Sequence, residues 1–131
     1  MPSAIVEVRR DYTPEQETYL LESVHQAVVR AFNVASTHRN VTLVVHLPHR
    51  FLGRTDCLTP EWLTNVSIFL LPGRSPEAKR KLYRFITEAF AVVGIPPSCV
   101  LIRLFELPAE NFGVRGGQAL CDVELGYPVN V

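Results

Sequence analysis

The chain contains an internal repeat with an offset of 62 residues, and this repeat constrains the fold more than any other feature. Thr13-Pro14-Glu15 and Ser75-Pro76-Glu77 both have the order typical of a helix start: a hydroxyl N-cap, a proline in the first turn, and an acid near the positive helix end. An apolar stripe with the spacing of an amphipathic helix follows each start. The stripes are Leu20, Val24, Ala27, Val28 and Ala31 in the first half and Leu82, Ile86, Ala89, Phe90 and Val93 in the second. The repeat therefore predicts two equivalent helices.

Strand-like apolar runs flank each predicted helix. They are residues 4–8 and 41–45 around the first helix, and residues 66–71 and 100–104 around the second. Because right-handed crossovers make the two strands of each half parallel, the two halves predict a four-stranded sheet with both helices on one face. The expected fold class is α/β, an α+β two-layer sandwich built from tandem β-α-β repeats. We expect one domain of residues 1–131, with pseudo-repeats at 2–47 and 65–107.

The other face of such a sheet has no layer of this chain to cover it. The strand residues Val6, Val8, Val44, Ile68, Leu70, Leu101 and Leu104 predict apolar character on both faces. We therefore expect another subunit to cover the second face. Residues 108–131 are the expected oligomerisation segment, because the apolar end of the tail, Tyr127, Val129 and Val131, is suited to docking on a neighbouring subunit.

Composition excludes several classes of protein. The 13 basic and 13 acidic residues cancel, so no global charge attracts nucleic acid or an anionic membrane. No apolar run reaches the length of a membrane span, and Met1-Pro2-Ser3 opens no secretory signal. The three cysteines are an odd number without CxxC spacing, which argues against a disulfide framework and a structural zinc site. We therefore expect a cytoplasmic protein in a reducing compartment.

Pro2 is the sharpest candidate for chemistry. Removal of Met1 would leave Pro2 with a free secondary amine at the start of a buried strand. The pKa of an α-amino group is about 8, and burial or a nearby cation lowers it toward neutral pH, where the amine can act as a general base. The alternative is that Pro2 is merely a common second residue. If Met1 is retained, the nitrogen is an amide without basicity.

The β-α-β duplication and several short segments together resemble the tautomerase superfamily, in its long form of two fused 4-oxalocrotonate-tautomerase-like units. The pattern is similar to that of malonate semialdehyde decarboxylase and other long members. The segments are Pro2, Val24-His25-Gln26-Ala27, Thr37-His38-Arg39, Gly73-Arg74-Ser75-Pro76-Glu77 and Pro108-Ala109-Glu110-Asn111-Phe112-Gly113. The resemblance implies a tautomerase/MIF-like fold, a homotrimer, and the amino-terminal proline as catalytic base.

Arg74 lies just before the N-cap of the second predicted helix, where helix N–H groups and a guanidinium can face an anion together. The resemblance implies that an arginine here binds the substrate carboxylate and polarises its carbonyl. The residues alone also fit a solvated arginine at a helix start. The decarboxylases often have a second arginine shortly before this one, but this chain has Pro72 at that place. Carboxylate binding therefore depends on Arg74 alone, unless Arg39 or Arg115 supplies another guanidinium.

His38 departs from the family pattern, because the decarboxylase and hydratase members carry an aspartate at this place. A histidine can act as base or cation near neutral pH but is no permanent carboxylate, which favours proton transfer over hydration or decarboxylation. The alternative is an exposed loop residue. Phe112 stands where many members have tryptophan, and it is the expected aromatic wall of the pocket or ordinary packing. Arg115-Gly116-Gly117 is either an anion-binding turn or only a tight turn.

The remaining signals are weak. His46-x-x-His49 has the residue types of a metal site, but Pro48 and the irregular spacing argue against one, so we expect no metal. Lys79, Arg80, Lys81 and Arg84 predict a solvated helix face without the interleaved aromatics of a nucleic-acid site.

Three hypotheses about function follow. The first is a cofactor-independent keto–enol tautomerase of a small oxo acid, in which Pro2 moves a proton and Arg74 holds the carboxylate while the carbonyl itself accepts the electrons. The second is a decarboxylase or hydratase of a small 3-oxo acid such as malonate semialdehyde. The third is a non-catalytic trimer of the same fold, with a ligand-binding or structural role.

Overall fold

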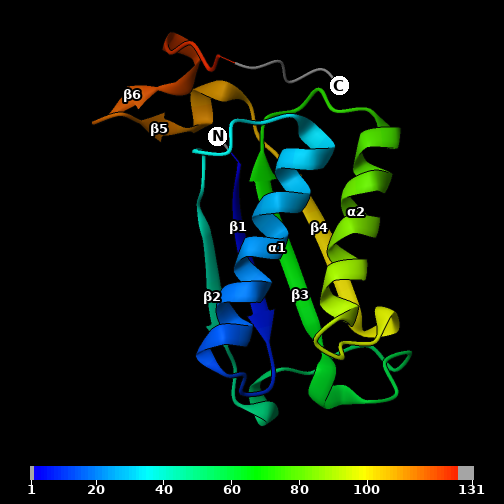
Figure 1. The fold of residues 1–131 in the computed structure, drawn as a ribbon. Coiled ribbons are helices and arrows are strands. Elements are labelled where there is room, and N and C mark those ends of the chain that lie inside the picture. Colours follow the sequence, from blue (N-terminus) through cyan, green and yellow to red (C-terminus); the bar gives the residue numbers. More distant parts are fainter. Residues whose placement is uncertain (1, 127–131) are drawn as a thin grey trace.

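A computed structural model describes residues 2–126 of the chain (Figure 1). Two long helices alternate with four strands, in the order that the repeat predicts. Their bounds are β1 Ser3–Val8, α1 Pro14–Phe32, β2 Val41–Val45, β3 Thr64–Leu70, α2 Pro76–Ala91 and β4 Val100–Glu106. A small hairpin of β5, Gly113–Val114, and β6, Gln118–Ala119, follows. Short 3-10 turns lie at Pro48–Arg50, Pro60–Trp62, Pro97–Cys99, Ala109–Asn111 and Leu120–Asp122.

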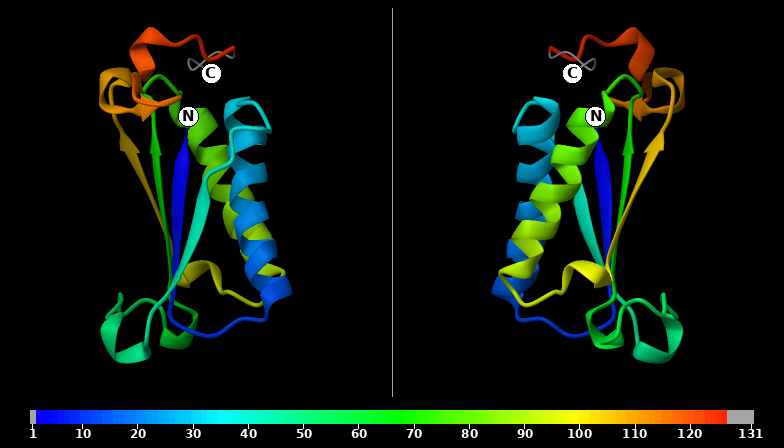
Figure 2. Two further views of the ribbon diagram at one scale, coloured as in Figure 1. Left: turned by 90° about the vertical axis from the view of Figure 1, so that its left-hand side faces the viewer. Right: turned by 90° about the vertical axis from the view of Figure 1, so that its right-hand side faces the viewer.

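The four long strands form one mixed sheet in the order β2-β1-β3-β4. The strands of each half are parallel, and the two halves meet through the antiparallel pair β1–β3, in which Val6 lies opposite Val66. Both helices pack on the same side of this sheet (Figure 2). The predicted two-layer α/β sandwich of tandem β-α-β repeats is therefore confirmed.

Local chemistry explains where the helices begin. The Thr13 hydroxyl accepts a hydrogen bond from the Gln16 backbone N–H, and the Gln16 side chain accepts one from the Thr13 backbone N–H, which completes a capping box. In the second half the Ser75 hydroxyl accepts from the Ala78 backbone N–H at 3.2 Å. The first apolar stripe is fully buried, whereas in the second stripe Ala89 and Val93 are half-buried.

The face of the sheet away from the helices is less apolar than we expected. Five of the seven residues predicted to make both faces apolar, Val6, Val8, Ile68, Leu70 and Leu104, pack on the helix side. Val44 and Leu101 lie on the open side. This side also carries polar contacts, since Arg103 donates to the Ser67 hydroxyl at 3.0 Å and His46 Nε2 lies 2.9 Å from Glu7 Oε1. Alternation along a strand requires this split, and apolar side chains alone do not reveal it.

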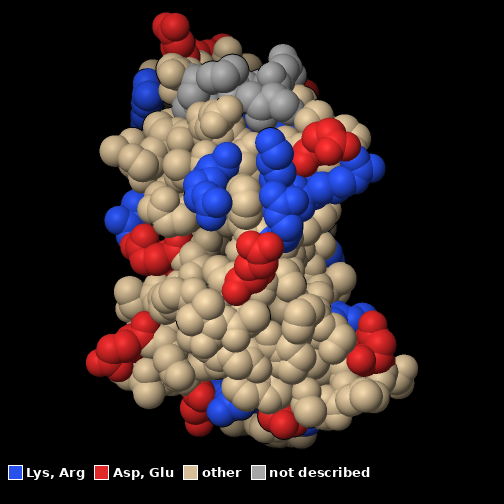
Figure 3. Space-filling view, turned by 45° about the vertical axis from the view of Figure 1, so that its right-hand side comes forward, with Lys and Arg blue, Asp and Glu red and all other residues tan. Residues whose placement is uncertain are grey.

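The helix face carries the predicted solvated charges. Basic and acidic side chains lie side by side on this surface (Figure 3). Arg80 pairs with Glu77, and Arg84 with Glu88, one helical turn apart. Among the helices within residues 2–126, none combines the length and apolar character needed to cross a bilayer. The predicted docking residues Tyr127, Val129 and Val131 lie outside the described residues.

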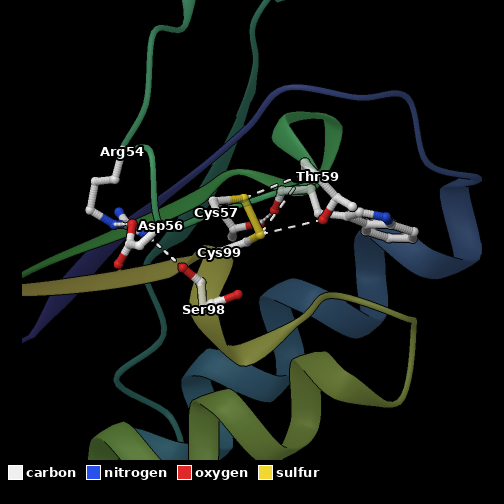
Figure 4. Close-up of a disulfide and its surroundings, with 8 residues drawn as sticks. Arg54, Asp56, Cys57, Thr59, Ser98 and Cys99 are labelled. Atoms are coloured by element: carbon white, nitrogen blue, oxygen red, sulfur yellow. Dashed lines mark hydrogen bonds and ion pairs between the residues drawn. A yellow bond between two sulfur atoms is a disulfide. The ribbon is translucent and has the colours of Figure 1, made fainter.

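The expectation of no disulfide is wrong. Cys57 and Cys99 are bonded across a sequence separation of 42 residues, with their Cα atoms 4.8 Å apart (Figure 4). The bond joins the connection between the halves to the turn that precedes β4, beside a contact of 3.0 Å from the Arg54 guanidinium to the Ser98 carbonyl. Local spacing cannot report a pairing made by the tertiary fold, so the cysteine count gives no support to a reducing compartment.

Replacing Cys57 and Cys99 together by serine is expected to lower the free energy of unfolding by about 2–4 kcal/mol, because the unfolded chain loses its cross-link. Chemical denaturation measures this change. The exposed Cys121 is the matched control, and its replacement by serine is expected to change stability little. Alkylation of all three cysteines in unfolded, unreduced protein would contradict the disulfide.

Candidate functional site

The predicted site residues meet at one edge of the sheet. β1 and β2 begin at this edge and β3 and β4 end there, because the two halves run antiparallel (Figure 1). A cavity of about 270 Å³ opens at this edge. Its walls come from the start of β1, the loop before β2 and the segment after β4. The lining residues are Pro2, Ser3, Thr37, His38, Arg39, Asn40, Phe112, Gly113 and Val114.

Pro2 is buried at the floor of this cavity. Beneath it, a small hollow between β1 and α1 is lined mainly by apolar side chains, among them Val24, Val28 and Ile68. A charged group in such a setting loses its hydrating water, and apolar side chains offer no hydrogen bonds in its place, so the charged form is disfavoured. The surroundings therefore favour the neutral form of any amine at this place.

His38 lies in the same cavity wall and also borders the small hollow. Burial lowers the pKa of His38 from its ordinary value, and the positive charges of the chain's amino terminus and of Arg115 lower it further. Both causes disfavour the imidazolium, so His38 is mainly neutral at pH 7. In that state the ring can donate one hydrogen bond and accept another.

Arg74 lies in the loop between β3 and α2 at the same edge, but its side chain does not line the cavity with Pro2. Its guanidinium is buried, donates to the Leu71 carbonyl at 3.0 Å and lies 5.1 Å from the centre of the Phe32 ring. Gly73, with a φ of 122°, makes the turn that sends the chain from β3 into the helix start. The alternative of a solvated arginine is thus excluded, and the Arg74 guanidinium is bound within its own chain.

The other predicted residues divide between the cavity and its rim. Phe112 lines the cavity, and its role as an aromatic wall stays a prediction. Arg39 contributes to the same wall, but its guanidinium pairs with Glu22 of α1. Arg115 adopts a left-handed φ of 47° in the turn between β5 and β6, and it acts on His38 through its charge. Asn40 was missed, although its place directly before a predicted strand was a usable signal; its carbonyl accepts from the Ala4 N–H at 2.8 Å.

The structure gives His46, one of the two histidines considered as weak metal-ligand candidates, other contacts. His46 lies against Glu7 and meets the Phe51 ring edge-on, with 5.5 Å between the ring centres. Within residues 2–126, no three side chains of metal-ligating type lie close enough together to form a site.

Comparison with known proteins decides the family. A family model described as "Tautomerase enzyme" matches residues 38–115, which is more than half of the chain. The chain belongs to this tautomerase family. The 2-hydroxymuconate tautomerase of Comamonas testosteroni is 36% identical over 53 residues, which is 40% of this chain and 84% of that protein. The matched model begins at His38, so Pro2 lies outside it.

Solved structures support the long, fused branch of the family. A malonate semialdehyde decarboxylase, solved in wild-type, mutant and inactivated forms, is 25% identical with a TM-score of 0.80, covering 89% of this chain and 93% of that one. Another, inhibited by 3-bromopropiolate, is 24% identical with a TM-score of 0.85, covering 96% and 99%. A fused 4-OT described as a symmetric trimer is 20% identical with a TM-score of 0.79, covering 90% and 98%. The last two likenesses concern the fold.

The His38 ring is expected to titrate with a midpoint below about 6.5, its unperturbed value. In Arg115→Gln the midpoint should rise but stay below that value, because burial is the larger cause. NMR of the imidazole protons measures both midpoints. Arg50→Gln, at the opposite edge of the sheet, is the matched control. A midpoint of His38 at or above about 6.5 in the parent protein would contradict this electrostatic description.

Proposed function

We propose that the protein is a cofactor-independent keto–enol tautomerase of a small oxo acid, with Pro2 as general base. The observation that carries the proposal is the burial of Pro2 at the floor of a cavity in a member of the tautomerase family. The cavity of about 270 Å³ suits a small organic acid rather than a polymer. The proposal requires that Met1 is removed, so that the Pro2 nitrogen is an amine.

The reaction moves one proton and needs no redox step. The neutral Pro2 nitrogen takes a proton from the carbon beside the substrate carbonyl, and the electron pair of that C–H bond moves into the carbonyl to form an enolate. The protonated nitrogen then delivers this proton to the enolate oxygen, which completes the enol and leaves the amine neutral for the next cycle. In the enol-to-keto direction the steps run in reverse.

The developing enolate oxygen and the carboxylate need donors. We assign Arg74 the role of binding the substrate carboxylate, because it stands at the same edge as Pro2 and its guanidinium can exchange the bond to the Leu71 carbonyl for a stronger, charged partner. The neutral His38 ring can donate one hydrogen bond toward the cavity, and Phe112 supplies an apolar wall beside the reacting carbon. The positive charges of Arg39 and Arg115 at the rim attract the acid to the mouth of the cavity.

Self-association belongs to the proposal. The open face of the sheet carries stacked Phe69 and Phe105, 4.9 Å apart, and Phe105 is 40% exposed in the single chain. Fused 4-OT proteins with the same fold are described as trimers. We propose that a homotrimer covers this face, with polar contacts from Arg103 and Glu7 setting the register.

Blocking the Pro2 nitrogen is the sharpest test of the proposed base. One extra glycine ahead of Pro2 makes that nitrogen an amide while every side chain stays in place, so tautomerisation of phenylenolpyruvate should fall at least about 100-fold in kcat. Pro2→Ala, which keeps a less constrained amine, should fall by a smaller factor. Pro14→Ala at the start of α1 is the matched control. Full activity in the glycine-extended chain would refute the proline base.

Decarboxylation of a 3-oxo acid is the second candidate, favoured by the likeness to malonate semialdehyde decarboxylase. In that reaction the protonated Pro2 assists loss of CO2 as a general acid. The two roles predict opposite pH profiles of kcat/KM: the tautomerase loses activity as Pro2 is protonated on lowering the pH, and the decarboxylase loses it as Pro2 is deprotonated on raising the pH. Assays of phenylenolpyruvate and malonate semialdehyde across pH separate them, and activity on neither would exclude both.

A further inference from the structure

We propose that His25 is a positioning residue of the candidate site: it ties the loop of residues 33–40 to α1 and so determines where His38 stands against Pro2. His25 lies on α1 and is only 5% exposed. Its Nε2 atom is 2.9 Å from the Ser36 carbonyl oxygen, two residues before His38. A carbonyl only accepts hydrogen bonds, so Nε2 carries the proton and donates.

The loop has no regular structure of its own to hold it. It leaves α1 at Asn33, which has a left-handed φ of 55°, and its inner turn is closed by the His38 N–H to the Ala35 carbonyl at 3.0 Å. Its far end is fixed where the Asn40 carbonyl accepts from Ala4 of β1. These contacts secure the two ends and the turn, whereas the bond from His25 fastens the middle of the loop to the helix.

A second side chain of α1 also reaches this loop, but on the outside. Glu22 pairs with Arg39, and the two side chains are 41% and 60% exposed. Water and salt screen such a pair, so it restrains the loop weakly. The His25 bond is screened much less, because the ring is buried and forms part of the wall of the hollow shared by Pro2 and His38.

The internal repeat offers a comparison within the molecule. The position 62 residues after His25 is Thr87, whose hydroxyl donates to the Tyr83 carbonyl of its own helix at 2.7 Å. The position equivalent to Pro2 is Thr64. Thr64 is an internal residue, so its backbone nitrogen is an amide and cannot act as a base. In that half the disulfide of Cys99 holds the segment before the strand. The helix-to-loop histidine therefore accompanies the half of the repeat that contains the candidate site.

The consequence for catalysis follows from distance. Thr37, His38 and Asn40 line the cavity, so a loop released from α1 moves its donors and charges relative to Pro2. A displacement of about 1 Å is enough to lower a rate by up to about 100-fold. This catalytic part rests on the proposed function, whereas the tie between helix and loop does not.

The test compares three variants of His25. His25→Phe keeps the shape and loses the donor; His25→Gln keeps a donor near the place of Nε2; His25→Asn is too short to reach Ser36 and replaces the Phe variant should that one fail to fold. Thr87→Val is the matched control, since it removes a hydrogen bond at the equivalent position of α2. The readouts are amide exchange at residues 36–39, the NMR titration midpoint of His38, and kcat and KM with phenylenolpyruvate.

We expect His25→Phe to speed amide exchange at residues 36–39 about fivefold or more and to raise the His38 midpoint toward about 6.5. It should lower kcat about tenfold with KM changed less than about twofold, and His25→Gln should restore most of each value. Unchanged exchange and an unchanged His38 midpoint in His25→Phe would overturn the proposal, as would equal changes in Thr87→Val. If the parent protein lacks tautomerase activity, the proposed function fails, while exchange and titration still decide whether His25 holds the loop.

Discussion

The antiparallel pairing of β1 with β3 is the constraint on which the rest of this structure depends. Each half of the chain is a β-α-β unit whose strands run in parallel, and a parallel pair alone exposes strand starts at one edge and strand ends at the other. Because β1 and β3 pair antiparallel, with Val6 opposite Val66, the strands of the second half run in the opposite direction to those of the first. The starts of β1 and β2 thereby meet the ends of β3 and β4, and Pro2, His38, Arg74 and Phe112 reach one edge although they are far apart in the sequence.

The electrostatics of that edge follow first from burial and then from nearby positive charge. Burial and the charge of Arg115 both disfavour the protonated form of His38, and the apolar hollow beneath Pro2 acts in the same direction on an amine. The buried Arg74 guanidinium donates to the Leu71 carbonyl and packs on the Phe32 ring. The proposed function needs a neutral base and a fixed cation at one site, because it binds an acid and removes a proton from it.

Much of the fold could be predicted from the sequence because the signals of the repeat are interactions between residues close together in the chain. The caps at Thr13 and Ser75 and the apolar stripes after them act within a few residues, so both helix starts were predicted correctly. The ends of all four long strands were placed to within about two residues. Pro2 was singled out by its place at the start of the chain and His38 and Phe112 by the family resemblance, and the roles of all three stay predictions. The boundaries of the two pseudo-repeats stay a prediction.

The features that sequence reasoning missed all depend on contacts between distant segments. Nothing near Cys57 reveals that the fold brings Cys99 beside it. Arg74 was expected either in solvent or on a substrate, and the Phe32 ring that receives it lies 42 residues earlier. Arg39 was expected to bind the substrate carboxylate, whereas its guanidinium pairs with Glu22 of α1. The polar contacts on the open face of the sheet also depend on how the strands are aligned. The register of β3 with β4 places Arg103 beside Ser67.

The central claim is that the chain begins with a free proline amine whose pKa is lowered below the ordinary α-amino value of about 8. A 15N NMR titration of proline-labelled protein, with its intact mass recorded on the same sample, tests this claim most directly. The other nine of the ten prolines are tertiary amides and serve as internal references that do not titrate. The account predicts a mass without Met1 and one titrating nitrogen with a midpoint below about 8. A mass that includes Met1, or a nitrogen that titrates at or above about 8, would contradict it.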